Sequence, residues 1–230
     1  MTAPVPIITI DGPSGSGKGT IADQLAQTLG WHLLDSGALY RLLALAAQQR
    51  GITEPEQHRA ELAKLAVSLP IEFRPDSSGN SKAWLDGVDV SGAIRQPQIS
   101  GLASRVAAIP EVRTGLLQRQ RGFLRLPGLV ADGRDMGTVV FTEAPLKIFL
   151  TASAEERAKR RYKQLKAKGE SVNIARLYRE IEERDRRDRN RKVAPLRPAA
   201  NAIVIDSTEM SIQKVLDEIL SLHYKLDLSL

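Results

Sequence analysis

Short apolar runs alternate with longer amphipathic segments along most of the chain. The short runs contain β-branched and aliphatic residues and end at polar or glycine positions, which predicts strands. We predict strands at 5–10, 32–34, 129–131, 146–150 and 202–205. The amphipathic segments place apolar residues three and four positions apart, or are dense in charge, and predict helices. We predict helices at 18–29, 36–49, 54–69, 98–108, 111–123, 153–168, 173–190 and 211–223.

The stretch between residues 70 and 95 breaks this alternation. Ser-Ser-Gly-Asn at 77–80 and Asp-Gly at 86–87 predict turns between small antiparallel strands at 71–74 and 82–90. Because the alternation of strand and helix resumes afterwards, we interpret the stretch as an insertion into one domain. The chain as a whole has 230 residues and predicts an α/β fold, with a parallel sheet covered by helices on both faces.

Composition excludes several classes of site. The chain has no cysteine, which excludes disulfides, thiolate catalysis and cysteine-ligated metals, and its three histidines are scattered. No apolar run approaches the length of a membrane span. The N-terminus lacks the charged-then-apolar pattern of a signal peptide, so we expect a cytoplasmic protein.

The positive charge is concentrated in one segment. The net charge is +6, but residues 155–197 hold 16 Lys and Arg against 8 Asp and Glu, whereas the rest of the chain holds 17 against 19. Three interpretations are open at this point: a solvated helix with internal ion pairs, a surface for nucleic acid, or a site for a small polyanion such as the phosphate tail of a nucleotide.

A glycine-rich loop between the first predicted strand and helix carries the strongest signal. It consists of Gly12, Pro13, Ser14, Gly15, Ser16, Gly17, Lys18, Gly19 and Thr20. The glycines allow successive backbone N–H groups to point at an anion, and the helix dipole favours negative charge there. The loop matches the phosphate-loop motif in its required context, so we predict that these nine residues bind ATP and that Lys18 reaches the β- and γ-phosphates. The chain has no Asn-Lys-x-Asp element to bind guanine, which disfavours a hydrolytic switch.

Magnesium is expected with the nucleotide. In the usual motif a hydroxyl residue follows the lysine, but here Gly19 follows, which leaves the metal-contacting hydroxyl open between Thr20 and Ser16. Asp132 directly follows a predicted buried strand, and we expect it to help to hold Mg²⁺ through water.

Candidates for an acceptor site lie at helix starts and strand ends. Helical geometry places Tyr40 one turn above Ser36, and Arg41 follows. Arg134 and Asp135 come just after the predicted strand 129–131, at the carboxyl end where open parallel sheets bind ligands.

The charged helix predicted at 173–190 has no apolar face at its end. Arg184, Asp188 and Arg191 fall within about 60° of one another on a helical wheel. Arginine dominates there and suits bidentate contacts to phosphate, so we favour closure over phosphates rather than a solvated helix end. Arg157, Arg160 and Arg161, near the start of the preceding helix, are predicted either to serve the donor phosphates or to face solvent.

Five segments together resemble the bacterial cytidylate kinases, a family of nucleoside monophosphate kinases. These segments are 12–20, 34–41, 89–95, 131–141 and 184–191. The resemblance implies a P-loop three-layer sandwich around a parallel five-stranded sheet, with an acceptor-binding insertion and a helical lid. The implied division is core at 1–69, insertion at 70–108, core at 109–156, lid and flanking helices at 157–192, and core at 193–230.

The resemblance also implies an activity and residue roles. It implies phosphorylation of CMP or dCMP by ATP with Mg²⁺. We further expect a monomer without nucleic-acid or membrane partners. The implied catalytic residues are Lys18, Arg134, Arg184 and Arg191, with Arg160 on ATP. The implied acceptor contacts are Ser104, Arg113 and Asp135 for cytosine, Arg184 and Asp188 for the sugar, Arg41, Arg134 and Arg191 for the phosphate, and Ser36 and Tyr40 in the pocket lining.

Asp135 has an independent physical use, because a carboxylate accepts a hydrogen bond from the cytosine amine but repels the uracil carbonyl. The alternatives are a kinase for another small acceptor such as UMP or a hydroxy acid, a nucleic-acid-binding ATPase, and an inactive nucleotide binder. With 4% aromatic residues, the chain offers few platforms for stacking single-stranded bases.

Overall fold

The computed structural model describes residues 4–75, 81–167 and 169–226. The chain forms two compact units, which are described separately. The first, here called the sheet unit, comprises residues 1–34 and 123–230, and the second, the inserted unit, comprises residues 35–122. No helix within the described ranges is long and apolar enough to cross a membrane.

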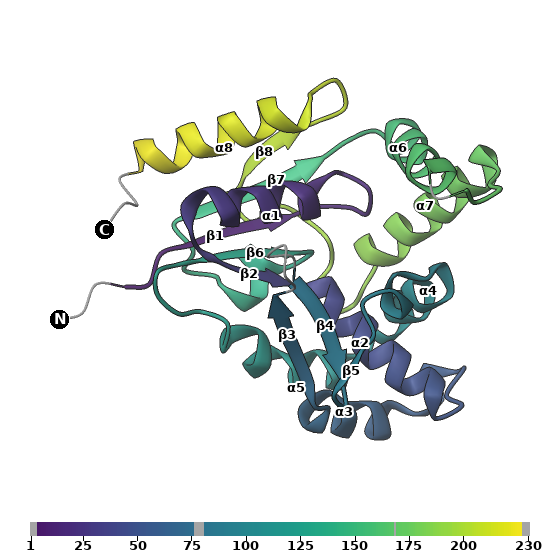
Figure 1. Ribbon diagram of the computed structural model, residues 1–230. Coiled ribbons are helices and arrows are strands. Elements are labelled where there is room, and N and C mark those ends of the chain that lie inside the picture. Colours follow the sequence, from purple (N-terminus) through teal and green to yellow (C-terminus); the bar gives the residue numbers. More distant parts are fainter. Residues whose placement is uncertain (1–3, 76–80, 168, 227–230) are drawn as a thin grey trace. The chain divides into compact units, whose positions relative to one another are not determined.

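The sheet unit is built on a five-stranded parallel sheet (Figure 1). Its strands are β1 (Ile7–Asp11), β2 (His32–Asp35), β6 (Leu129–Gly133), β7 (Leu146–Thr151) and β8 (Ile203–Asp206). Their order is β2-β6-β1-β7-β8, so the first strand is central, and all five of its residues are buried. The predicted α/β fold and its five strands are confirmed, and each strand begins and ends within two residues of its expected bounds.

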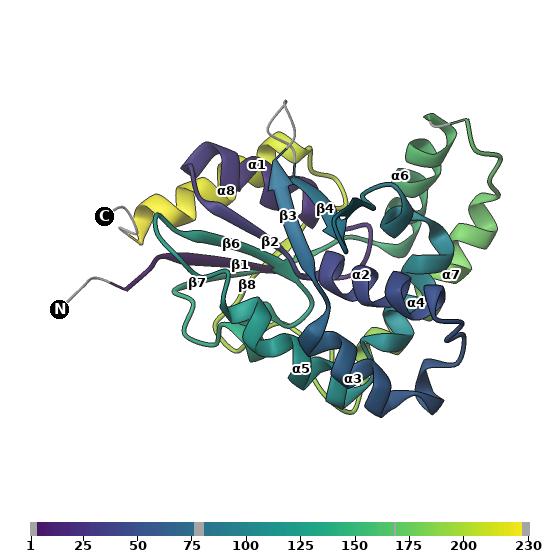
Figure 2. The same ribbon diagram turned by 60° about the horizontal axis from the view of Figure 1, so that its bottom comes forward.

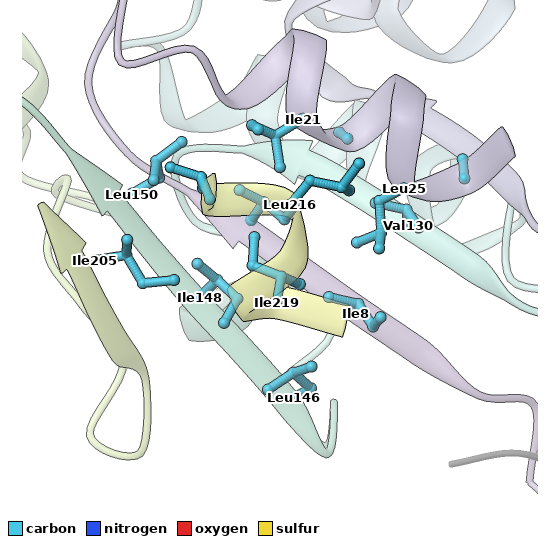
Figure 3. Packing of buried hydrophobic residues seen from close by; sticks show 14 residues of the cluster. Ile8, Ile21, Leu25, Val130, Leu146, Ile148, Leu150, Ile205, Leu216 and Ile219 are labelled. Atoms are coloured by element: carbon cyan, nitrogen blue, oxygen red, sulfur yellow. The ribbon is translucent and has the colours of Figure 1, made fainter. Parts of the chain in front are cut away.

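Helices α1 (Lys18–Leu29) and α8 (Ile212–Lys225) cover one face of this sheet. Figure 3 shows Ile21 and Leu25 of α1 and Ile219 of α8 packed against strand residues such as Ile8 and Ile148. All five of these side chains are almost fully buried, and this apolar burial is the main favourable term that stabilises the layer. Helix α1 has its predicted bounds and begins at Lys18, so its first turn contains the last three residues of the glycine-rich segment.

Helices α6 (Ala154–Ala167) and α7 (Ile174–Arg189) pack side by side (Figure 1). Both were predicted from the sequence; Lys168, the last residue of the first prediction, lies outside the described residues. The second helix ends at Arg189 and is capped by Asn190, so Arg191 follows the helix instead of extending its face as the helical wheel assumed.

The inserted unit contains two helix pairs and a small sheet. Figure 2 shows α2 (Ser36–Gln49) beside α4 (Pro97–Val106) and α3 (Arg59–Ser68) beside α5 (Pro110–Arg121). The antiparallel strands β3 (Ile71–Pro75), β4 (Ser81–Leu85) and β5 (Val88–Asp89) follow in sequence order, as the turn at 86–87 predicted. The turn predicted at 77–80 lies outside the described residues.

Two expectations for this unit need correction or restatement. The single helix expected at 54–69 is wrong: a 3₁₀ turn at Pro55–Gln57 is separated from α3 by His58, whose backbone leaves the helical region. The compact unit, residues 35–122, is also wider than the expected insertion at 70–108, because α2 packs against α4 and α3 against α5. The functional division of the chain stays a prediction.

Candidate functional site

The glycine-rich loop joins the central strand β1 to α1 and depends on its glycines. A Cβ atom at Gly12 would lie 2.0 Å from the carbonyl oxygen of Leu150, so no side chain fits there. Gly15 and Gly17 have φ values of 80° and 93°, which L residues with side chains rarely adopt. Lys18 is buried, and its Nζ donates a hydrogen bond to the Pro13 carbonyl oxygen at 2.9 Å across the loop. The loop therefore already holds the lysine over its own backbone.

Oxygen atoms suited to a hard cation lie around the start of α1. The Ser16 hydroxyl is buried and has no hydrogen-bond partner among the described residues. A Cβ atom at Gly19 would lie 3.4 Å from Oδ2 of Asp132, so this carboxylate stands directly beside the helix, and Thr20 is exposed on it. Across the described ranges, no three His, Cys, Asp or Glu side chains gather to hold a metal by themselves. This donor set fits Mg²⁺, which usually keeps water and substrate phosphates among its ligands.

Two arginines of α6 brace the loop from outside. Nη1 of Arg157 donates to the Ser14 carbonyl oxygen at 3.0 Å. Arg160 donates from Nη1 to the Ser16 carbonyl oxygen at 3.3 Å and from Nη2 to the Ser207 carbonyl oxygen at 2.6 Å. Arg157 is 2% exposed, so the solvent-facing interpretation of this residue is wrong. The sequence carried no local signal for these braces because their partners in the loop lie more than 140 residues earlier in the chain.

Three arginines of the sheet unit interact with a buried aspartate on α7. Asp188 is 1% exposed, accepts from Nε of Arg134 at 3.0 Å and forms an ion pair with Arg191. Burial raises the pKa of the Asp188 carboxyl, but the charges of Arg134, Arg191 and Arg184 outweigh it and hold the pKa below its usual value. Nη1 of Arg184 also donates to the Ser14 hydroxyl at 3.3 Å, which brings the group to the loop. The structure thus brings together all four of these predicted residues, Arg191 included although it lies beyond the helix.

Asp135 begins a single π-helical turn, Met136–Val140, directly after β6. The turn starts beside the loop because β6 pairs in parallel with β1, with Asp11 opposite Gly133. Asp135 is 2% exposed, and the two N–H groups that follow it bond to the carboxylate of Asp11, each at 2.8 Å. Burial raises the pKa of Asp11 to about 7, against the lowering effect of these two hydrogen bonds. No pattern in the sequence pointed to this role of Asp11.

The inserted unit holds the remaining predicted residues. The Arg113 guanidinium lies 5.7 Å from the Tyr40 ring centre and donates to the Ala107 carbonyl oxygen at 3.0 Å. Arg41 pairs with Asp35 at 2.7 Å, and the same aspartate caps the start of α2. Ser36 and Ser104 are both buried, and the Ser104 hydroxyl has no hydrogen-bond partner within the described part of the chain.

The chain is similar to known proteins over almost its whole length. A family model described as "Cytidylate kinase" matches residues 8–225. A curated "Cytidylate kinase" from Stutzerimonas stutzeri is 60% identical over 222 residues, covering 96% of each chain. The chain belongs to the cytidylate kinase family. A second curated "Cytidylate kinase", from Klebsiella pneumoniae, is 57% identical over 220 residues and again covers 96% of both chains. A solved shikimate kinase from Acinetobacter baumannii covers 98% of this chain and 96% of its own, at 17% identity and a TM-score of 0.45.

Membership in the cytidylate kinase family confirms the resemblance inferred from the five sequence segments, and it identifies the protein as an enzyme of the kinase class. Family membership also places this cytidylate kinase among the nucleotide-binding enzymes. The individual roles of the loop, guanidinium and inserted-unit residues remain predictions.

Proposed function

We propose that the enzyme transfers the γ-phosphate of ATP directly to a phosphate oxygen of CMP or dCMP, by in-line displacement with Mg²⁺. Family membership supports the acceptor class, since the relatives are named for cytidylate. The acceptor oxygen is already anionic near neutral pH, so no protein base is required. Catalysis then depends on alignment and on the neutralisation of crowded oxygens.

The observation that carries this proposal is the group of arginines around Asp188. If the charged helix were simply solvated, Arg134, Arg184 and Arg191 would lie apart in water. Instead, the buried carboxylate of Asp188 orients Arg134 and Arg191, and the positive charges of the arginines lower its pKa. The third reaches Ser14 in the glycine-rich loop. Fixed positive charge beside a phosphate-binding loop is what phosphoryl transfer requires.

Each part of the sheet unit has a role in the proposal. The loop residues 12–20 bind the ATP phosphates, and Lys18 exchanges its bond to the Pro13 carbonyl for the β- and γ-phosphates. Arg134 and Arg191 bind the acceptor phosphate, and Arg184 and Asp188 bind the sugar. Arg160 contacts ATP while bracing the loop. Residues 157–192 act as the lid, which excludes water so that ATP is not hydrolysed.

Mg²⁺ bound with ATP would be held by Thr20 directly and by Asp132 through water, and it would neutralise charge on the β- and γ-phosphates. The buried Ser16 hydroxyl is the alternative to Thr20. The usual motif has a hydroxyl residue where this chain has Gly19. The Asp132 carboxylate lies beside Gly19, so an oxygen ligand is close to that position even without a hydroxyl side chain.

In this proposal, the inserted unit supplies cytosine and phosphate contacts. Ser104 and Arg113 contact the base, and Arg41 contacts the phosphate. Ser36 and Tyr40 line the pocket. The buried Ser104 hydroxyl supports its assignment, since a buried hydroxyl without a partner among the described residues is costly unless a ligand completes it.

Steady-state rates with CMP, dCMP, UMP and AMP as acceptors test the proposal. We expect ATP-dependent formation of the diphosphate to be fastest with CMP or dCMP. A higher kcat/KM for UMP or AMP would contradict the acceptor assignment. ATP hydrolysis that is stimulated by RNA and independent of CMP would favour the nucleic-acid-binding ATPase, and binding without turnover would favour the inactive binder.

We also propose that the enzyme works as a cytoplasmic monomer without nucleic-acid or membrane partners.

Asp135→Ala is expected to narrow the preference for CMP over UMP. The carboxylate accepts from the cytosine amine and repels the uracil carbonyl, and a base contact of this kind contributes about 1–3 kcal/mol of discrimination. We therefore expect the ratio of kcat/KM values for CMP and UMP to fall by roughly 10-fold or more. Circular dichroism checks that the variant is folded like wild type. If the ratio is then unaltered, residues other than Asp135 select the base.

A further inference from the structure

Asp11 is the last residue of β1 and holds a segment 125 positions later in the chain. It is 4% exposed, and its two carboxylate oxygens accept hydrogen bonds from Met136 N and Gly137 N, one each, at 2.8 Å. These N–H groups open the π-turn, where no earlier turn of helix supplies acceptors for them. The side chain therefore caps this turn from a neighbouring strand.

Other contacts of the π-turn also hold residues 136–140 in place. The Asp135 carbonyl oxygen accepts from Val139 N at 2.9 Å, which closes the turn. A Cβ atom at Gly137 would lie 3.0 Å from Oγ1 of Thr9 and 3.1 Å from Cδ of Lys147, so the backbone sits directly on the sheet. The carboxylate bonds and this close packing together fix the backbone on which Arg134 and Asp135 stand.

We propose that Asp11 is a positioning residue of the kinase reaction, whose carboxylate fixes the direction in which Arg134 and Asp135 point toward the acceptor nucleotide. This inference rests on the proposed function. Asp11 is followed at once by Gly12, so its backbone leads into the loop for the donor while its side chain holds the turn for the acceptor. Asp11 thereby helps to position the donor and the acceptor relative to each other.

The charges that face Asp11 make an amide the sharpest replacement. The nearby carboxylates of Asp135 and Asp132 both raise the pKa of Asp11, in the same direction as burial. Asp11→Asn removes charge from this acidic group without changing side-chain volume. It keeps one acceptor oxygen, but its NH₂ group faces a backbone N–H and cannot accept that bond. The turn is expected to shift while the glycine-rich loop is retained.

The experiment measures kcat and KM for CMP and UMP, and ATP affinity by isothermal titration calorimetry, in wild type and Asp11→Asn. Displacement of reacting groups by as little as 1 Å can cost about 100-fold in rate, so we expect kcat/KM for CMP to fall by about 10–100-fold. We also expect the preference for CMP over UMP to narrow, with ATP affinity close to wild type. A merely structural role would lower activity toward both acceptors and ATP affinity together.

Asp206→Asn is the matched control. Asp206 also ends a strand of the same sheet and accepts from a backbone N–H, that of Thr208 at 2.9 Å, but it is exposed and caps only its own loop. We expect wild-type values for both acceptors in this variant.

Gly137→Ala probes the same position without touching the carboxylate. The added methyl group would press on Thr9 and Lys147 and lift the turn away from Asp11, so we expect the same acceptor-specific loss. If Asp11→Asn does not fold, this variant decides: full activity toward CMP would overturn the inference. An Asp11→Asn enzyme with wild-type constants, or with proportional losses for all substrates, would also overturn it. A wild-type enzyme inactive toward CMP would instead contradict the proposed function.

Discussion

Lys18→Ala is expected to lower kcat by about 100- to 1,000-fold while CMP binding remains measurable. Removal of one preorganised donor to transition-state charge has an effect of this size, and Lys18 combines a full charge with burial at the start of α1. The hydrogen bond from its Nζ to the Pro13 carbonyl oxygen holds the side chain across the loop. Single-turnover rates of CDP formation measure the loss.

The control for this variant is Lys163→Ala, an exposed lysine on α6, for which we expect wild-type kcat. CMP affinity, measured by calorimetry in both variants, separates a chemical effect from misfolding. If kcat of Lys18→Ala equals that of wild type, the lysine takes no part in the chemistry.

Asp185→Asn is expected to reduce the free energy of unfolding by about 3 kcal/mol, because breaking a buried ion pair leaves an uncompensated charge. Arg157 donates to both carboxylate oxygens of Asp185, at 2.6 and 3.1 Å, and both side chains are nearly inaccessible. The pair joins α6 to α7, and the same guanidinium bonds to the Ser14 carbonyl oxygen of the loop. Urea denaturation measures the change, and we also expect weaker ATP binding.

Glu180→Gln on the same helix is the control. Its partner Arg176 lies one turn away at 2.8 Å, but both side chains are at least half exposed. Exposed ion pairs contribute little to stability, so we expect a denaturation midpoint within error of wild type. A similarly small effect of Asp185→Asn would mean that α6 and α7 are held together by other contacts.

Local patterns predicted most of the elements because the forces that define those elements are themselves local. Helix α1 has its expected bounds because a glycine stands on each side of a regular apolar spacing. Gly17 precedes the first helical residue, and Gly30 ends the helix in a left-handed conformation. The pattern failed where backbone geometry interrupts a continuous spacing. At His58 the chain leaves the helix, although the apolar positions continue on both sides.

Site residues were predicted where they follow a strand or belong to a motif, and missed where their partners are distant in sequence. Arg134 and Asp188 were both singled out, but from separate segments, and only the fold shows that they form an ion pair across 54 positions. Arg157 and Asp11 bond to backbone atoms of residues far away in the chain, and a backbone partner leaves no trace in the sequence. Such contacts depend on strand order and helix packing, which no local pattern encodes.

The buried carboxylates of α7 have a consequence for behaviour at high ionic strength. Asp185 pairs with Arg157 and Asp188 with Arg191, and all four side chains are nearly inaccessible to water, so dissolved ions screen their attraction much less than at the surface. The exposed pairs of the same helix will dissociate as salt is added, but these two inner groups will keep their geometry. Salt should therefore weaken acceptor binding mainly by supplying competing anions, and a noncompeting salt should leave the affinity for CMP almost unchanged.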